Sequence, residues 1–507
     1  MSPDHIGQFE HFDEIDSPEF ERHDKHNFEV ALDYLIDSKK DKNIFMLEMF
    51  GFIPNSLQIN EQTYSQSNFY NDTRILTRYK TPKISLKTLI NPNKSRSPLN
   101  RIDSYLESPE ETSSKLKYEI RMLGAISRVN IRDGLNIYAS LLNLNSEHNF
   151  DEKQFMKFVS RVKTLKRMLH ELYEKIIHSP LTIEIKNAFS FMAQFVFVQI
   201  ELRFSKFIGK VESPISEHIR ELIINLIDET KEEKKHFQPT INLDFTESGE
   251  RFEHSEGLLK KFNQRVLYLE QIRKKKENQV KQLAYSIAAG VAMVVSILLT
   301  FLIVYQFPQN SLPFVIGLIL VYMFKDRIKF FFQWLSKKTL RIFIADRTHK
   351  LYDAYEKTEI GTIRETMRFL VKSEIPDEIA LLRDLERSEI EHQENLETVF
   401  FYKKIMQLRV STLSKIHNRV KNVHDIVRFN IRNFIQYADD PFKEYPVIDR
   451  EMGDKLKTVK QYKVYHLNLI FRISRLKSKK YKESIFKRVR IILDQDGIKR
   501  LEYPKVQ

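Results

Sequence analysis

The chain has 507 residues, and its 82 Lys and Arg against 68 Asp and Glu give a formal net charge of +14. It contains no cysteine, which excludes structural disulfides, thiolate zinc sites, iron–sulfur clusters and cysteine nucleophiles. The length allows two or three domains, and the positive charge indicates acidic neighbours, with anionic lipid and nucleic acid as the candidates.

Residues 1–111 are predicted to form a largely flexible N-terminal arm. The opening is acidic and has no basic segment followed by an apolar one, so we expect no cleaved signal peptide. Residues 71–101 cluster Lys, Arg, Pro, Ser and Asn without a sustained period, which is typical of flexible chain. We predict one short helix within 27–52, and we interpret His23 and His26 as part of the arm and not as metal ligands.

Residues 112–250 are predicted to form an all-α cytosolic bundle. Apolar residues recur at helical spacing from Leu116 to Val129 and again from Phe155 to Leu172. The segment 188–200 is apolar on nearly every side but is too short to cross a membrane, so we interpret it as the buried central helix of the bundle.

Residues 251–282 are predicted to form a stalk helix that leads into the next segment. Leu259, Phe262, Val266 and Leu269 alternate at spacings of three and four, as in a coiled coil. The stripe covers two heptads, and two interpretations stay open: a homodimer formed through the stalk, or packing of the stripe on its own bundle.

Residues 283–324 are predicted to form a two-span transmembrane hairpin. Residues 283–305 contain no charged side chain over 23 positions, enough to cross a hydrocarbon core of about 30 Å. The second span, 312–324, is shorter, about 20 Å at 1.5 Å per residue. Lys and Arg flank the hairpin and are absent from its connector, so the positive-inside rule places both termini in the cytoplasm.

A membrane-interface set of basic and aromatic residues is predicted on both sides of this hairpin. Residues 325–338 have aromatic side chains facing lysines, as an interfacial amphipathic helix does, although burial against the following domain is the alternative. The set consists of Lys274, Lys275, Lys276, Lys325, Arg327, Lys329, Phe331, Phe332, Trp334, Lys337 and Lys338.

Residues 339–507 are predicted to form an α+β cytosolic domain that ends in an antiparallel β-meander. Apolar residues alternate over 465–473 and 485–493, and Asp496-Gly497 is typical of a tight turn into a last strand. Residues 411–437, by contrast, have helical spacing.

A basic loop between the two predicted strands is a candidate contact with an anionic surface, and a solvated hairpin loop is the alternative. Its basic residues are Arg475, Lys477, Lys479, Lys480 and Lys482. A nucleic-acid partner is less favoured because Tyr481 is the one aromatic residue among them.

The sequence has no phosphate-binding loop, dinucleotide fingerprint, nucleophile elbow or zinc-protease motif, and we predict no cofactor and no metal. We therefore expect a bacterial inner-membrane protein that acts as a non-enzymatic scaffold or regulator and binds lipid bilayer and other proteins. The alternative is an enzyme that acts on a lipid or nucleotide at the membrane surface through the C-terminal domain.

Overall fold

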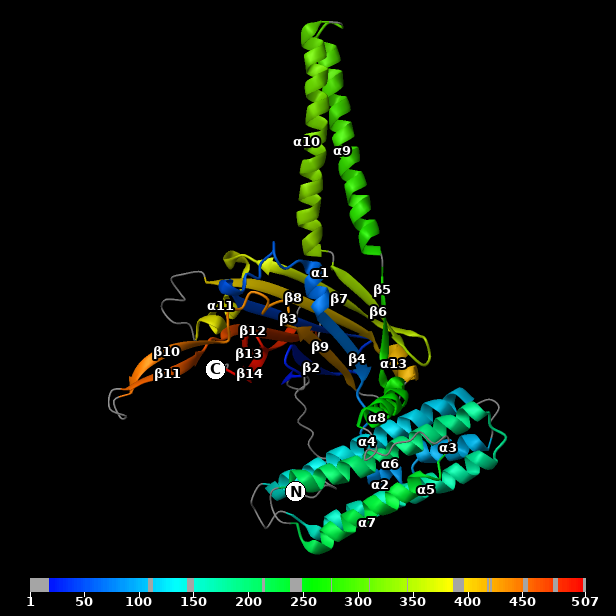
Figure 1. Ribbon diagram of the computed structural model, residues 1–507. Coiled ribbons are helices and arrows are strands. Elements are labelled where there is room, and N and C mark those ends of the chain that lie inside the picture. Colours follow the sequence, from blue (N-terminus) through cyan, green and yellow to red (C-terminus); the bar gives the residue numbers. More distant parts are fainter. Residues whose placement is uncertain are drawn as a thin grey trace.

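The computed structural model divides into two packed β-sheets, a helix bundle on one side of them and a pair of long helices that projects from the other side (Figure 1). It describes residues 18–107, 113–143, 150–211, 215–237, 249–274, 276–309, 311–343, 345–385, 396–416, 419, 422–449, 455–476 and 482–504.

The larger sheet has eight strands in the order β14-β13-β12-β3-β8-β7-β6-β5, and every neighbouring pair is antiparallel. Its strands are β3 (Lys42–Pro54), β5 (Leu269–Arg273), β6 (Arg347–Asp353), β7 (Glu359–Leu370), β8 (Glu397–Arg409), β12 (Tyr465–Leu476), β13 (Lys482–Asp494) and β14 (Gly497–Glu502). Strands β12, β13 and β14 are the last three in the chain. They form where the alternation of apolar residues predicted a β-meander.

The smaller sheet has the order β1-β2-β9-β4 and packs face to face on the larger one. Its strands are β1 (Glu19–Arg22), β2 (Asn27–Leu35), β4 (Thr73–Tyr79) and β9 (Asn422–Asn430). Side chains of β2 alternate between buried and half-buried, as expected of a strand with one face on the core. Phe28 of this sheet meets Leu47 and Phe471 of the larger sheet in an apolar interior.

The predicted flexible arm is wrong, because the first 79 residues supply four strands, including the centre of the larger sheet. Strand β3 pairs with β8 along its whole length and with β12 on its other side. Most of β3 is buried on both faces, so its sequence is a nearly continuous apolar run without a clear period. Its partners are more than 340 residues away in the chain.

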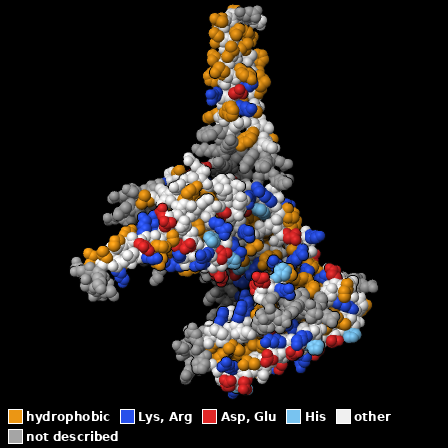
Figure 2. All heavy atoms as spheres, in the orientation of Figure 1, with side chains coloured by type: hydrophobic (Ala, Val, Ile, Leu, Met, Phe, Trp, Pro, Cys, Tyr) orange, Lys and Arg blue, Asp and Glu red, His pale blue; other side chains and the backbone are white. Residues whose placement is uncertain are grey.

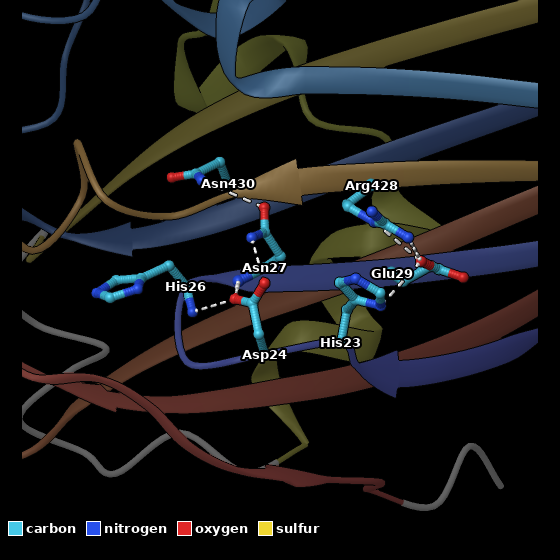
Figure 3. A network of polar contacts seen from close by, with 7 residues as sticks. All are labelled: His23, Asp24, His26, Asn27, Glu29, Arg428 and Asn430. Atoms are coloured by element: carbon cyan, nitrogen blue, oxygen red, sulfur yellow. Dashed lines mark hydrogen bonds and ion pairs between the residues drawn. The ribbon is translucent and has the colours of Figure 1, made fainter. Parts of the chain in front are cut away.

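The turn between β1 and β2 is held by a polar network (Figure 3). The Asp24 carboxylate accepts hydrogen bonds from the backbone N–H groups of His26 (2.7 Å) and Asn27 (2.9 Å). Glu29 accepts two from the Arg428 guanidinium at 2.8 and 3.0 Å, which ties β2 to β9. His26 therefore lies in an ordered turn, and no group of metal-ligating side chains is found among the described residues.

The helices of the bundle are inserted between β4 and β5, so the bundle is not an all-α N-terminal domain. They are α2 (Leu86–Leu89), α3 (Pro98–Leu106), α4 (Ser113–Asn143), α5 (Glu152–His178), α6 (Ile183–Lys210), α7 (Glu217–Lys234) and α8 (Gly249–Gln264). Helix α6 runs through the centre, and its Phe195 and Phe197 are fully buried, in agreement with the apolar pattern of 188–200.

The predicted stalk helix is also wrong. Helix α8 ends at Gln264, a 3-10 turn follows at Arg265–Leu267 (η3), and the chain then enters strand β5. Leu259 packs against Phe195 and Phe252 of the bundle, and Val266 lies in the main core. The apolar stripe is thus covered by its own chain and is unavailable as a coiled-coil seam.

Helices α9 (Lys276–Gln306) and α10 (Leu312–Phe343) form the projecting pair, inserted between β5 and β6. A two-stranded ribbon, β10 (Phe442–Asp449) with β11 (Lys455–Tyr462), extends from another side of the body (Figure 1). The remaining short elements are α1 (Gln66–Asp72), α11 (Asp377–Asp384), α13 (Val410–Ile416), η2 (Asn55–Leu57) and η4 (Lys372–Glu374).

Candidate membrane anchor and buried polar network

Helix α9 carries a long apolar surface that the rest of the chain leaves uncovered. Its segment Tyr285–Gln306 is, among the described residues, the one helical stretch long and apolar enough to cross a membrane. Its 22 residues span about 33 Å at 1.5 Å per residue, against a hydrocarbon core of about 30 Å. Phe301 is 67% exposed and Leu302 61%, and Figure 2 shows the column of hydrophobic side chains.

The predicted two-span hairpin is wrong, because α10 does not meet the same criterion. Its apolar run ends at Phe324, and Lys325, Asp326 and Arg327 follow within the same helix. Helix α10 instead packs along α9. Gly317 lies so close to Ile303 that an added Cβ would be 3.1 Å from its side chain, and Ala292 of α9 is 1% exposed.

Of the residues predicted at the membrane interface, those from Lys325 to Phe332 lie near the middle of α10, between its apolar run and the sheets. Lys325, Arg327 and Lys329 follow the apolar run of α10, and the rings of Phe331 and Phe332 meet edge to face at 5.7 Å. Lys274 closes β5 by donating its backbone N–H to Thr348. Lys275 lies outside the described residues, as do the side chains of Lys276, Trp334, Lys337 and Lys338, whose backbones belong to the two helices.

The predicted anionic-surface contact is wrong for Arg475. Its side chain is 3% exposed, and its Nη2 donates to Asn43 Oδ1 at 3.2 Å and lies 3.7 Å from Asp37. Strand β12 continues beyond the predicted alternation and carries Arg475 inward against β3. Lys477, Lys479 and Lys480 lie outside the described residues, and Lys482 begins β13, with its side chain outside the described part.

The helix pair is joined to an edge of the larger sheet. Strand β5 precedes α9 and strand β6 follows α10, and the two strands are antiparallel partners with Arg273 opposite His349. The chain thus leaves the sheet at one strand and returns beside it. This connection fixes the base of both helices on hydrogen-bonded strands.

A series of polar contacts leads from this edge of the larger sheet into the protein interior. His349 Nε2 lies 3.4 Å from Glu365 Oε2 on the neighbouring strand β7. Glu365 Oε1 accepts a hydrogen bond of 2.8 Å from the hydroxyl of Tyr402 on β8. Burial, together with the charge of Glu365, raises the pKa of Tyr402 well above its usual value, so this phenol stays protonated as a donor.

The interior also holds a buried ion pair. Lys404 Nζ on β8 lies 2.7 and 2.6 Å from the two carboxylate oxygens of Asp425 on β9. Thr77 Oγ1 of β4 donates to Asp425 at 3.1 Å, and the Tyr34 hydroxyl of β2 bonds to it as well. Burial, followed by the charge of Asp425, raises the pKa of Tyr34. The carboxylate therefore connects strands of both sheets.

A small cavity lies between the sheets beside Tyr402. It measures about 10 Å³, the space of a single water, and its lining is almost wholly apolar. The network was missed in the sequence because each member is a single polar residue in a separate strand. No local motif marks a pair such as Lys404 and Asp425.

Comparisons with protein-family models, with curated proteins and with solved structures found no match.

The β10–β11 ribbon presents apolar side chains to solvent away from the helix pair. Ile448 and Leu456 are directly opposite each other in the register and are 60% and 74% exposed. Tyr445 and Tyr462 are 49% and 70% exposed. Such an uncovered, protruding ribbon is typical of an element that contacts another molecule.

Proposed function

We propose that the protein is a membrane-anchored scaffold or regulatory protein, in which α9 enters the bilayer and the β10–β11 ribbon binds other proteins. The observation that carries the proposal is the exposed apolar length of α9. In water this surface would cost about 25 cal/mol per Å² of apolar area, and lipid removes that cost. Helix α10 packs on α9 and returns the chain to the sheet.

The basic residues that follow the apolar run of α10 support this orientation. Lys325, Arg327 and Lys329 lie between the apolar part of α10 and the sheets, where each can add about 1 kcal/mol of attraction to anionic lipid. An excess of Lys and Arg marks the cytoplasmic side of a membrane. We therefore place the body of the protein, which contains both β1 and β14, on the cytoplasmic face of the bacterial inner membrane.

The protein-binding role is supported by the β10–β11 ribbon. The ribbon extends from the body on a side away from the tip of the helix pair (Figure 1), and its Ile448, Leu456 and Tyr462 are exposed. A partner could cover these side chains or add a strand to an open edge of the ribbon.

The proposal is tested by purification of the detergent-solubilised chain from its own cells, with and without Ile448→Ser and Leu456→Ser. We expect a partner in fixed stoichiometry with the unaltered chain, and its loss from the double variant. Leu258→Ser serves as the control, because Leu258 is 50% exposed on α8, outside the ribbon. Purification of the unaltered chain alone, with hydrolytic turnover in an activity screen, would overturn the proposal.

A further inference from the structure

Four arginines gather where the helix bundle meets strand β4, and we define them as the arginine cluster: Arg78, Arg128, Arg132 and Arg203. Arg128 and Arg132 are one turn apart on α4, so they share a face of that helix. Arg203 comes from α6, which packs on α4, and Arg78 comes from β4. All four side chains are half-buried and so remain accessible from solvent.

The cluster is poor in carboxylates of its own. Arg132 Nε donates to Asp133 at 2.7 Å. Glu256 of α8 also lies near Arg128, and it accepts a hydrogen bond of 3.0 Å from Gln199. Arg128 Nε is buried, and among the described residues it has no hydrogen-bond partner.

Acids farther along β2 also face Arg78 but are engaged elsewhere. Asp33 is bound by Lys80 and by His424, whose Nδ1 lies 2.7 Å from it. Glu29 is bound by the Arg428 guanidinium. Among the described residues, the cluster and its surroundings thus carry more positive than negative charge.

The guanidinium groups destabilise one another's charge. Burial, followed by repulsion from Arg203, Arg132 and Arg78, lowers the pKa of Arg128 to about 10. The pKa of Arg203 is lowered in the same way, by burial and then by Arg132. Burial and mutual repulsion of these guanidinium groups are unfavourable. Binding of an anion among them would explain why the fold holds them together.

We propose that the arginine cluster is a binding site for a soluble phosphate-bearing anion, such as a di- or polyphosphate. Guanidinium groups suit phosphate because their planar N–H groups bond two oxygens at once. Because α4 and α6 lie across the sheets from the tip of α9 and α10, a bilayer that holds α9 does not reach the cluster (Figure 1). The source is therefore a dissolved ligand and not a lipid headgroup of the same membrane.

Calorimetric titration of the full-length chain in detergent with inorganic pyrophosphate tests the site, with sodium chloride at equal ionic strength as the blank. We expect saturable binding that Arg128→Gln or Arg203→Gln weakens by on the order of tenfold or more, the effect of one charged hydrogen bond. Arg220→Gln, on the exposed face of α7, should leave the dissociation constant unchanged.

A second measurement separates this site from a structural role. Without pyrophosphate, Arg128→Gln should raise the thermal midpoint, because one repelling charge is removed, whereas a purely structural arginine would lower it. If Arg128→Gln fails to fold, Arg203→Lys keeps the charge but loses the bidentate geometry and should still weaken binding. Absence of saturable binding, equal weakening by Arg220→Gln, or binding only to bicelles containing anionic lipid would overturn the proposal.

Discussion

Lys404 and Asp425 form an ion pair of 2.6 Å between the two sheets, with side chains that are 1% and 0% exposed. Because the pair is sealed from solvent, loss of one partner leaves a buried charge uncompensated, which costs about 3–5 kcal/mol. We expect Lys404→Met and Asp425→Leu each to lower the free energy of unfolding by that amount. Chemical denaturation in detergent micelles measures it.

The double variant is the control for this pair. With both charges replaced by apolar side chains of similar volume, the stability should recover most of the loss. Additive losses in the double variant would show that the two side chains do not depend on each other.

Gly497 is required at the turn between β13 and β14. Its φ of +128° is one that other residues rarely adopt, and an added Cβ would lie 2.3 Å from the carbonyl oxygen of Lys25. That oxygen accepts a 2.7 Å hydrogen bond from the Ile498 backbone, so it is held in place. We expect Gly497→Ala to destabilise the protein by about 1–3 kcal/mol in thermal unfolding.

Gly257 provides the comparison, because an added Cβ meets no atom within 4 Å on helix α8. Gly257→Ala should stabilise by up to about 1 kcal/mol through helix propensity. Equal effects of the two substitutions would contradict the turn geometry.

Asp33 should make the protein sensitive to acid. Burial opposes its ionisation, but hydrogen bonds from His424 and Lys80 outweigh burial and hold the pKa of Asp33 below 3.8. The stabilisation is complete above the unfolded-state pKa of about 3.9 and is lost as the pH falls through the lower folded-state value. We expect Asp33→Asn to reduce the loss of stability below pH 4.

Urea unfolding at a series of pH values from neutral to acidic measures this dependence. Asp440→Asn is the matched control, because Asp440 lies in an exposed loop. An unchanged acid slope in Asp33→Asn would refute the assignment.

Strand β3 should be essential for the fold of the C-terminal strands. It lies between β8 and β12, so its removal leaves two long unpaired edges and opens the core beneath them. We expect a chain that starts at Gly249 to be rapidly degraded by protease, and co-expression with residues 18–107 to restore resistance. A protease-resistant fragment without β3 would contradict the sheet order.

The spacing of apolar residues predicted those helices and strands whose packing partners are close in the sequence. The alternation in β12 and β13 and the apolar helix at 188–200 are examples. Strand β9 was predicted as helix because Val423 and Val427 are four residues apart, a spacing that places side chains on one face of either a helix or a strand. Only pairing with β2 and β4, more than 340 residues distant, decides between them.

The candidate anchor was visible in the sequence, whereas the sites inside the body were not. The uncharged run from Leu283 to Tyr305 needs no partner to be recognised. The Lys404–Asp425 pair and the arginine cluster are assembled from separate elements, and each arginine alone resembles a solvated surface residue. The sequence similarly places Arg475 in a basic loop, whereas in the structure it is buried and contacts Asn43.

Replacement of the helix pair tests the central claim most directly. Residues 274–348 can be exchanged for an Asn-Gly turn, because Arg273 and His349 are already cross-strand partners. We predict that the unaltered chain floats with membranes and resists carbonate extraction, whereas the replaced chain is soluble and keeps the β-rich circular dichroism of the sheets. An unaltered chain recovered in the soluble fraction, or a replaced chain that still floats, would contradict anchoring through α9.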